Sequence, residues 1–107
     1  MKSRSLTTTK KIAPVHPGEV LREDVLNPLG MSINKLALSL GVPATRMQEI
    51  VSGRRAITPG TALRLARFLG TTPEFWVRLQ ARYDLEVARD KFGAAVERAV
   101  QPREATA

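Results

Sequence analysis

The chain has 107 residues and carries 17 Lys and Arg against 10 Asp and Glu, which gives a formal net charge of +7. This length supports one domain and is too short for two ordinary cores with a linker. The absence of cysteine excludes disulfides and thiolate metal sites, and the sequence has no apolar run long enough for a membrane span or a signal peptide. We therefore expect a cytoplasmic protein, and its scarcity of aromatic residues favours helices over a sheet.

The basic residues concentrate in residues 1–17 and 31–72, whereas the charges of residues 73–107 balance. A basic zone beside a neutral end is typical of a protein that places one face on a polyanion and keeps another for a protein partner. A solvated basic surface without a nucleic acid is the alternative, because charge alone does not distinguish the two.

Residues 1–17 show no hydrophobic periodicity, and we expect them to form a flexible basic arm ahead of a folded domain over residues 18–91. The arm could reach into a minor groove or act only as a solubilising tail. Its basic residues are Lys2, Arg4, Lys10 and Lys11.

Two helices are predicted at the start of the domain. The first covers residues 18–27, where apolar side chains recur at helical spacing until Pro28 and Gly30 end the pattern. The second begins after Ser32, a good N-cap residue, and its apolar residues follow the spacing of an amphipathic helix up to Gly41.

Three further helices are predicted over residues 44–52, 59–69 and 73–91, each opened by a proline and the first two closed by a glycine. Residues 92–107 are predicted to form a frayed tail, in which helix as far as Val100 is an open alternative. The sequence thus predicts an all-α domain of five short helices.

The junction of the second and third helices has the residues that a helix-turn-helix motif requires. Ala37 is small enough for close helix contact, Gly41 can adopt the left-handed conformation of the turn, and Met47 and Ile50 provide the buried side. We therefore expect the third helix to enter the major groove of double-stranded DNA.

With Met47 and Ile50 inward, helical geometry turns the polar side of the third helix outward, either to read base edges or to be solvated. The predicted base-reading residues are Ala44, Thr45, Gln48 and Glu49. Residues that flank this face are expected to bind backbone phosphates. The predicted phosphate-binding residues are Ser32, Asn34, Lys35, Arg46, Arg54 and Arg55.

Several longer segments extend the pattern beyond the motif. They are His16-Pro17-Gly18-Glu19, Gly41-Val42-Pro43, Glu49-Ile50-Val51-Ser52-Gly53-Arg54-Arg55, Thr61-Ala62-Leu63-Arg64-Leu65-Ala66 and Pro73-Glu74-Phe75-Trp76-Val77-Arg78-Leu79-Gln80, followed by Tyr83-Asp84-Leu85. In this order they resemble HigA-type antitoxins of the XRE (lambda-repressor-like) helix-turn-helix family, over about residues 16–91. The resemblance implies an operator-binding dimer that represses its own operon and neutralises a HigB toxin, a RelE-like mRNA endonuclease. One departure is Ile33, where many phage-repressor relatives have glutamine, so that Asn34 or Lys35 would make the backbone contact.

The fifth helix gathers most of the aromatic residues. We expect Phe75 and Trp76 to close the core, and Leu79, Tyr83 and Val87 to form the interface of a two-fold homodimer. For the toxin, two surfaces remain open: the N-terminal arm with the first helix, and the tail after residue 91.

No constellation of acid, base and nucleophile accompanies His16, the only histidine in the chain. We therefore expect no catalytic residue, no metal site, no cofactor and no enzymatic activity, and we expect His16 to pack against the first helix. A stand-alone repressor of the same fold and a protein-interaction module whose charge is incidental are the alternatives to an antitoxin.

Overall fold

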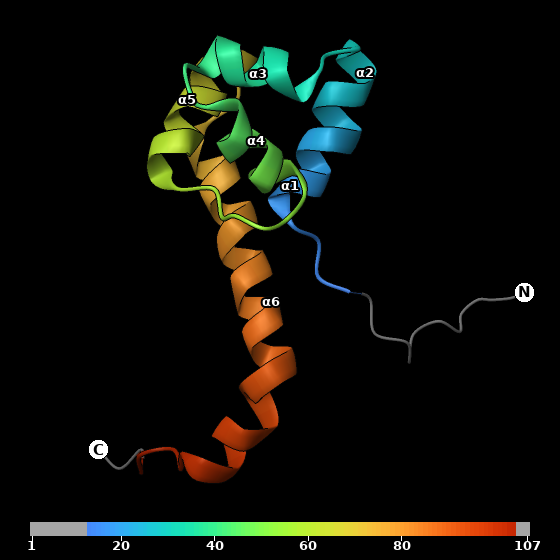
Figure 1. The fold of residues 1–107 in the computed structure, drawn as a ribbon. Coiled ribbons are helices and arrows are strands. Elements are labelled where there is room, and N and C mark those ends of the chain that lie inside the picture. Colours follow the sequence, from blue (N-terminus) through green and yellow to red (C-terminus); the bar gives the residue numbers. More distant parts are fainter. Residues whose placement is uncertain (1–12, 105–107) are drawn as a thin grey trace, which may run out of the picture.

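The structure is a computed structural model that describes residues 13–104, and every regular element in that range is helical. Five helices follow one another over these residues, as predicted (Figure 1). In the described part, no helix is both long enough and apolar enough to cross a membrane.

The first helix is continuous but changes its winding twice, from α1 (Pro17–Val20) to the π-helical η2 (Leu21–Leu26) and then to α2 (Asn27–Leu29). Pro28 does not end this helix, contrary to the prediction; the helix ends at Gly30, which has a φ of 61°. A proline normally clashes with the carbonyl four residues before it, and the wider π turn changes which carbonyl faces that position.

The helix-turn-helix motif consists of α3 (Ile33–Leu40) and α4 (Ala44–Val51). Ser32 caps α3, because its hydroxyl accepts the Lys35 N–H at 3.0 Å. Gly41 takes the left-handed conformation, with a φ of 71°, and turns the chain between the helices. The predicted cap and turn are therefore confirmed.

The last two helices are α5 (Pro59–Leu69) and α6 (Pro73–Ala99), and both begin with a threonine cap followed by proline, as predicted. However, α6 continues beyond the expected end at Lys91, so the open alternative of a helical tail is the one observed as far as Ala99. Its 27 residues correspond to about 40 Å of helix. Its C-terminal half leads away from the other helices (Figure 1).

The core lies where all five helices meet, and Trp76 is its largest fully buried side chain. The indole N–H of Trp76 donates to the Thr71 hydroxyl at 2.8 Å, so the buried ring keeps a polar partner. Phe75 is 43% exposed and contacts Trp76 edge-on, so the prediction that it closes the core was wrong. Neighbouring residues on a helix point about 100° apart, and only one of the two can face inward.

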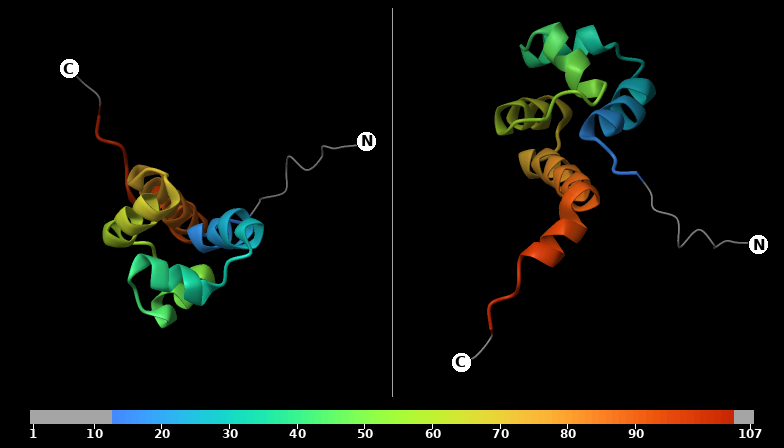
Figure 2. Two further views of the ribbon diagram at one scale, coloured as in Figure 1. Left: turned by 90° about the horizontal axis from the view of Figure 1, so that it is seen from above. Right: turned by 60° about the horizontal axis from the view of Figure 1, so that its bottom comes forward.

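Both views in Figure 2 show α3 and α4 on one side of the domain and α6 leading away from it. The recognition motif and the free end of the last helix are thus at opposite parts of the molecule. This arrangement leaves the outer face of α4 uncovered by other elements of the described chain.

Candidate nucleic-acid interface

The outward face of α4 is set by its buried side. Met47 and Ile50 are fully buried and Val51 is 4% exposed, which fixes the rotation of the helix about its axis. Thr45 and Gln48 are consequently exposed, and Ala44 is partly buried against the core. The helix therefore offers a short polar surface at the side of the domain where a major groove could receive it.

Gln48 is oriented by a neighbour on α3. Its amide nitrogen donates to the side-chain oxygen of Asn34 at 3.3 Å, which joins a predicted base reader to a predicted phosphate binder. This bond uses one of the two amide hydrogens and leaves the other hydrogen and the carbonyl oxygen for further contacts. Those are the two groups that a glutamine uses to bind adenine through two hydrogen bonds.

Glu49 and Arg55 form an ion pair, with 2.6 Å between the Glu49 Oε1 and the Arg55 Nε atoms. The side chains are 38% and 51% exposed, so the pair lies at the surface. A carboxylate held by Arg55 is turned toward the loop after α4, and a contact of Glu49 with cytosine would have to compete with this pair. Base reading by Glu49 and phosphate binding by Arg55 therefore depend on each other.

The loop after α4 carries its arginines in an ordered turn. The Arg54 backbone N–H donates to the Glu49 carbonyl at 2.8 Å, and its Nε donates to the Ser52 hydroxyl at 2.9 Å. Both Arg54 and Arg55 are exposed. The loop can therefore offer two cations to a polyanion without first becoming ordered.

At the other end of the motif, the Ser32 hydroxyl accepts the Lys35 N–H and keeps its own hydrogen for a phosphate oxygen. Asn34, Lys35 and Arg46 are exposed. Ile33 is partly buried and packs against the core. The predicted contacts of Lys2, Arg4, Lys10 and Lys11 lie outside the described residues.

Two buried polar side chains behind the interface were not predicted as functional residues. The ring Nδ1 of His16 accepts the Gly18 N–H at 2.9 Å, and the ring meets Tyr83 edge-on at 4.8 Å. The Gln80 Oε1 accepts the Ile57 N–H at 2.8 Å, and its amide donates to Asp84 at 2.9 Å. A signal was available for Gln80, because a glutamine on the apolar side of the fifth helix needs a buried partner.

His16 and Pro17 are buried, so the folded part of the chain begins earlier than the predicted boundary at residue 18. Burial lowers the pKa of His16. The charge of Asp84 and a hydrogen bond with the Arg55 backbone raise the pKa, but these two effects are smaller than that of burial. The expectation that His16 packs beside the first helix is met, and the histidine also caps that helix.

Gly18 lets the first helix approach α4 very closely. A Cβ atom at this position would lie 1.9 Å from the Ile50 carbonyl oxygen, so only glycine fits. Beside it, Arg22 donates to the Val51 carbonyl at 3.3 Å and satisfies one of the terminal carbonyls of α4. The first helix therefore supports the end of α4 from which the arginine loop departs.

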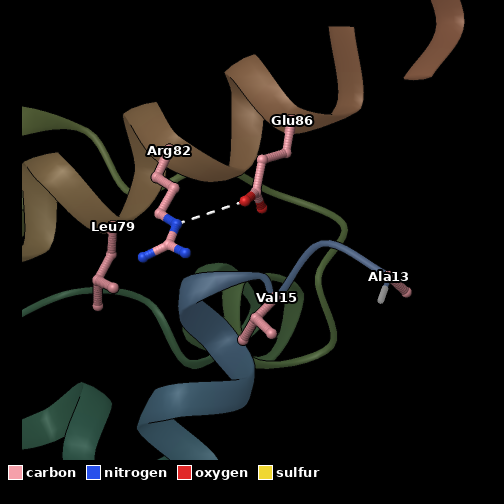
Figure 3. Close-up of a pocket in the computed structure, with 5 residues that line it drawn as sticks. All are labelled: Ala13, Val15, Leu79, Arg82 and Glu86. Carbon is pink, nitrogen blue, oxygen red and sulfur yellow. Dashed lines mark hydrogen bonds and ion pairs between the residues drawn. The ribbon is translucent and has the colours of Figure 1, made fainter. Parts of the chain in front are cut away.

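The predicted dimer residues lie on the inner side of α6. Leu79 packs against the core, Tyr83 contacts His16, and Val87 is partly buried. Leu79 also lines a cleft of about 410 Å³ between α6 and the segment ahead of α1, with the Arg82–Glu86 ion pair above Val15 (Figure 3). Much of the surface of these residues is thus used within one protomer.

Among the described residues, no group of three or more His, Cys, Asp or Glu side chains could hold a metal ion. The capped α3, the glycine turn and the exposed polar face of α4 define a DNA-binding helix-turn-helix domain of the lambda-repressor-like class.

Comparisons with known proteins agree with this class. The helix-turn-helix family model matches residues 21–76. An addiction module antidote protein of the HigA family from Coxiella burnetii is 48% identical, with a TM-score of 0.82 over 86% of this chain and 100% of that chain. The Pseudomonas aeruginosa antitoxin HigA, solved with the higBA promoter, is 36% identical with a TM-score of 0.83, over 85% of this chain and 99% of that one. Virulence-associated protein I of Dichelobacter nodosus is 47% identical over 69% of this chain and 68% of its own length.

The chain therefore belongs to the HigA-type antitoxins of the XRE (lambda-repressor-like) helix-turn-helix family.

Proposed function

We propose that the protein is an operator-binding antitoxin: a homodimer that binds palindromic DNA, represses its own operon and neutralises a HigB-like, RelE-related mRNA endonuclease. The observation that carries the DNA-binding part is the exposed polar face of α4, with Gln48 already oriented by Asn34. The promoter complex of the Pseudomonas aeruginosa relative supports the same use of the fold.

Base reading is assigned to the outward residues of α4. Thr45 offers a methyl group to thymine or a hydroxyl to a base edge, Gln48 binds adenine, and Ala44 allows close approach. Glu49 can accept from cytosine where Arg55 moves from the carboxylate to a phosphate. The phosphate contacts flank this face and fix the position of the helix without reading sequence. They are assigned to Ser32, Asn34, Lys35, Arg46, Arg54 and Arg55.

Dimerisation is assigned to α6, because one short recognition helix reads only a few base pairs and two half-sites supply the rest. The exposed side of α6 presents large apolar residues, with Leu85 51%, Phe92 58% and Val96 52% exposed. Ala81, Ala88 and Ala95 share this side of the helix at heptad spacing, which lets a second helix approach closely. We name Leu85, Phe92 and Val96 the outer stripe of α6; in this assignment Leu79, Tyr83 and Val87 remain inside each protomer.

The toxin partner is supported by family membership, and the runner-up is a stand-alone repressor with no toxin. A neighbouring gene for a small, basic, RelE-like protein would favour the antitoxin, and co-purification of the two products would establish the pair. If the neighbouring product neither co-purifies nor inhibits growth when expressed alone, the stand-alone repressor is the better assignment.

DNA reading is tested by measuring affinity for the operator and for a scrambled duplex as a function of salt. Replacing Thr45 and Gln48 by alanine should remove the preference for the operator, with a loss of about 1–3 kcal/mol for each reader. The matched control Arg54→Ala should weaken binding to both duplexes equally and reduce the salt slope by about 1. Full discrimination by the double variant would contradict the assignment of these readers.

A further inference from the structure

We infer that His16 and Gln80 are positioning residues for DNA binding, which hold the Arg54–Arg55 loop at the edge of α4 so that its cations meet the phosphate backbone. Neither residue is exposed enough to touch DNA, since they are 9% and 7% exposed. The inference rests on the proposed DNA-binding function and assigns to it two residues that lie behind the interface.

The loop between α4 and α5 is tied to the domain at two points. The first is the His16 ring, which lies beside Gly53 and whose pKa, lowered overall by burial, is raised in part by a backbone hydrogen bond of Arg55. Two residues further along, the Ile57 N–H donates to Gln80 at 2.8 Å. Because the backbone is fixed on both sides of residue 56, the guanidinium groups of Arg54 and Arg55 extend from a nearly fixed base.

The two ties meet on α6. The His16 ring contacts Tyr83, and the Gln80 amide donates to Asp84, the next residue along the helix. Gly53, with a φ of 84°, brings the start of the loop against the His16 ring, where an added Cβ would lie 3.7 Å from it. The N-terminal segment, the arginine loop and α6 are therefore joined through one small polar cluster around the buried His16 and Gln80 side chains.

The geometry of His16 requires the neutral imidazole. Its Nδ1 accepts the Gly18 N–H, so the hydrogen must be on Nε2, and a proton added to Nδ1 would face another donor. Protonation would thus break the cap of α1 and loosen the ring that holds the loop. The titratable side chains facing the ring are Asp84, whose charge raises the pKa of His16, and the neutral Tyr83, both on α6, and the loop faces it with the Arg55 backbone.

This arrangement predicts that DNA binding weakens as the pH falls, which is opposite to the usual behaviour of a basic protein. Added positive charge ordinarily strengthens the binding of a basic protein to DNA. Here operator affinity should fall as the pH decreases below 6.5, the ordinary pKa of histidine, because burial lowers the pKa of His16 and only the neutral ring accepts the Gly18 N–H that fixes it beside the loop.

The central variant is His16→Asn. Asparagine is a good helix cap and can still accept the Gly18 N–H, but it is too short to keep the bond with the Arg55 backbone. We expect binding to operator and scrambled DNA to weaken equally by about tenfold, with the salt slope reduced by about 0.9 for each phosphate that the loop no longer binds. The pH dependence below 6.5 should disappear in this variant.

Gln80→Met tests the second tie, since methionine is similar in size and cannot accept the Ile57 N–H. It should lower the salt slope in the same way and leave the pH profile unchanged. Arg82→Gln is the matched control on α6, because Arg82 pairs with Glu86 on the same helix and its side chain is 78% exposed. It should leave both DNA readouts as in the unsubstituted protein.

A second measurement avoids the question of whether a variant folds. In the unmodified protein, the amide chemical shifts of Gly53, Arg55 and Ile57 should change with the same midpoint as the His16 ring when the pH falls from 7.5 to 5. The inference is overturned if the ring titrates while these amides stay unchanged, or if folded His16→Asn keeps the salt slope and pH profile of the unsubstituted protein. If the protein binds no operator, the proposed function fails, and the amide titration still decides whether His16 holds the loop.

Discussion

The helix-turn-helix motif and the C-terminal half of α6 are both helical, but they are held in different ways. In the motif, Met47 and Ile50 are fully buried, Ser32 caps the start of α3, Gly41 turns the chain at its end, and Arg22 donates to the Val51 carbonyl at the end of α4. In α6 beyond Glu86, Phe92 and Val96 are more than half exposed, and the helix leads away from the core (Figure 1).

The motif is thus held by burial within one chain, whereas the C-terminal half of α6 keeps apolar side chains exposed, where the proposed partner chain would bind. Burial fixes the rotation of α4, and a one-residue change in its register would expose Met47. Phe92 is 58% exposed in the described chain, and in the proposed dimer a second chain would cover its apolar surface. Rigidity at the motif and unused apolar surface on α6 are the features that a dimeric DNA reader needs.

The largest effect is expected from Gly18→Ala, which tests how tightly the motif is supported. The new Cβ would overlap the Ile50 carbonyl oxygen, and backbone atoms cannot move aside as a side chain can. We expect the free energy of unfolding to fall by about 3 kcal/mol, the upper part of the range for overpacking. Urea denaturation measures the loss.

Gly60→Ala is the matched control for this prediction, because its Cβ would meet nothing closer than a side-chain oxygen at 3.9 Å. It should leave stability unchanged or raise it slightly. A decrease of less than about 1 kcal/mol for Gly18→Ala would mean that the first helix can separate from α4 at little cost.

The next largest effect is expected from Leu85→Glu combined with Phe92→Glu on the outer stripe of α6. Burial of such side chains contributes about 1.5–3 kcal/mol each, so the dimer dissociation constant should rise at least about a hundredfold. Sedimentation velocity over a range of concentrations measures the change. The folded domain should persist, because both positions are more than half exposed in the protomer.

Two controls separate this surface from others. Leu29→Glu adds one such charge at an apolar residue that is 59% exposed on α2, and it should leave the dimer intact. Val87→Thr changes the inner side of α6, where the sequence pattern predicts the dimer contact. A dimer that survives the double variant but dissociates with Val87→Thr would favour the inner side of α6 as the interface.

The fold was largely predictable because its signals are local. Ser32, Thr58 and Thr72 each accept the N–H three residues ahead, and Gly41 takes the left-handed turn expected of it. A cap or a glycine turn depends on a few neighbouring residues, and these stand together in the sequence. The outward face of α4 followed in the same way from the spacing of Met47 and Ile50.

The support behind the site was not predictable in this way, because it depends on contacts between distant segments. His16 meets Tyr83, and Gln80 meets Ile57, only after the chain has folded. The pairing of Glu49 with Arg55 across six residues also depends on the turn between them. The prediction for Pro28 failed for a different reason, since a π-helical turn is a departure from the regular spacing on which the expectation was built.

The smallest expected effect is that of Gly93→Ala, the counterpart of Gly18→Ala in the exposed half of α6. At residue 93 the helix is regular and the new Cβ would meet only the Arg89 Cβ at 4.0 Å, so there is space for it. Alanine in a helix interior is favoured over glycine by about 0.8–1.0 kcal/mol. Hydrogen exchange of the amides of residues 94–99 should slow several-fold, while exchange within α4 should not change. A glycine-to-alanine change would thus destabilise the packed motif at residue 18 and stabilise the exposed half of α6 at residue 93. If Gly93→Ala also slowed exchange within α4, the stability of the motif would depend on that of the C-terminal half of α6.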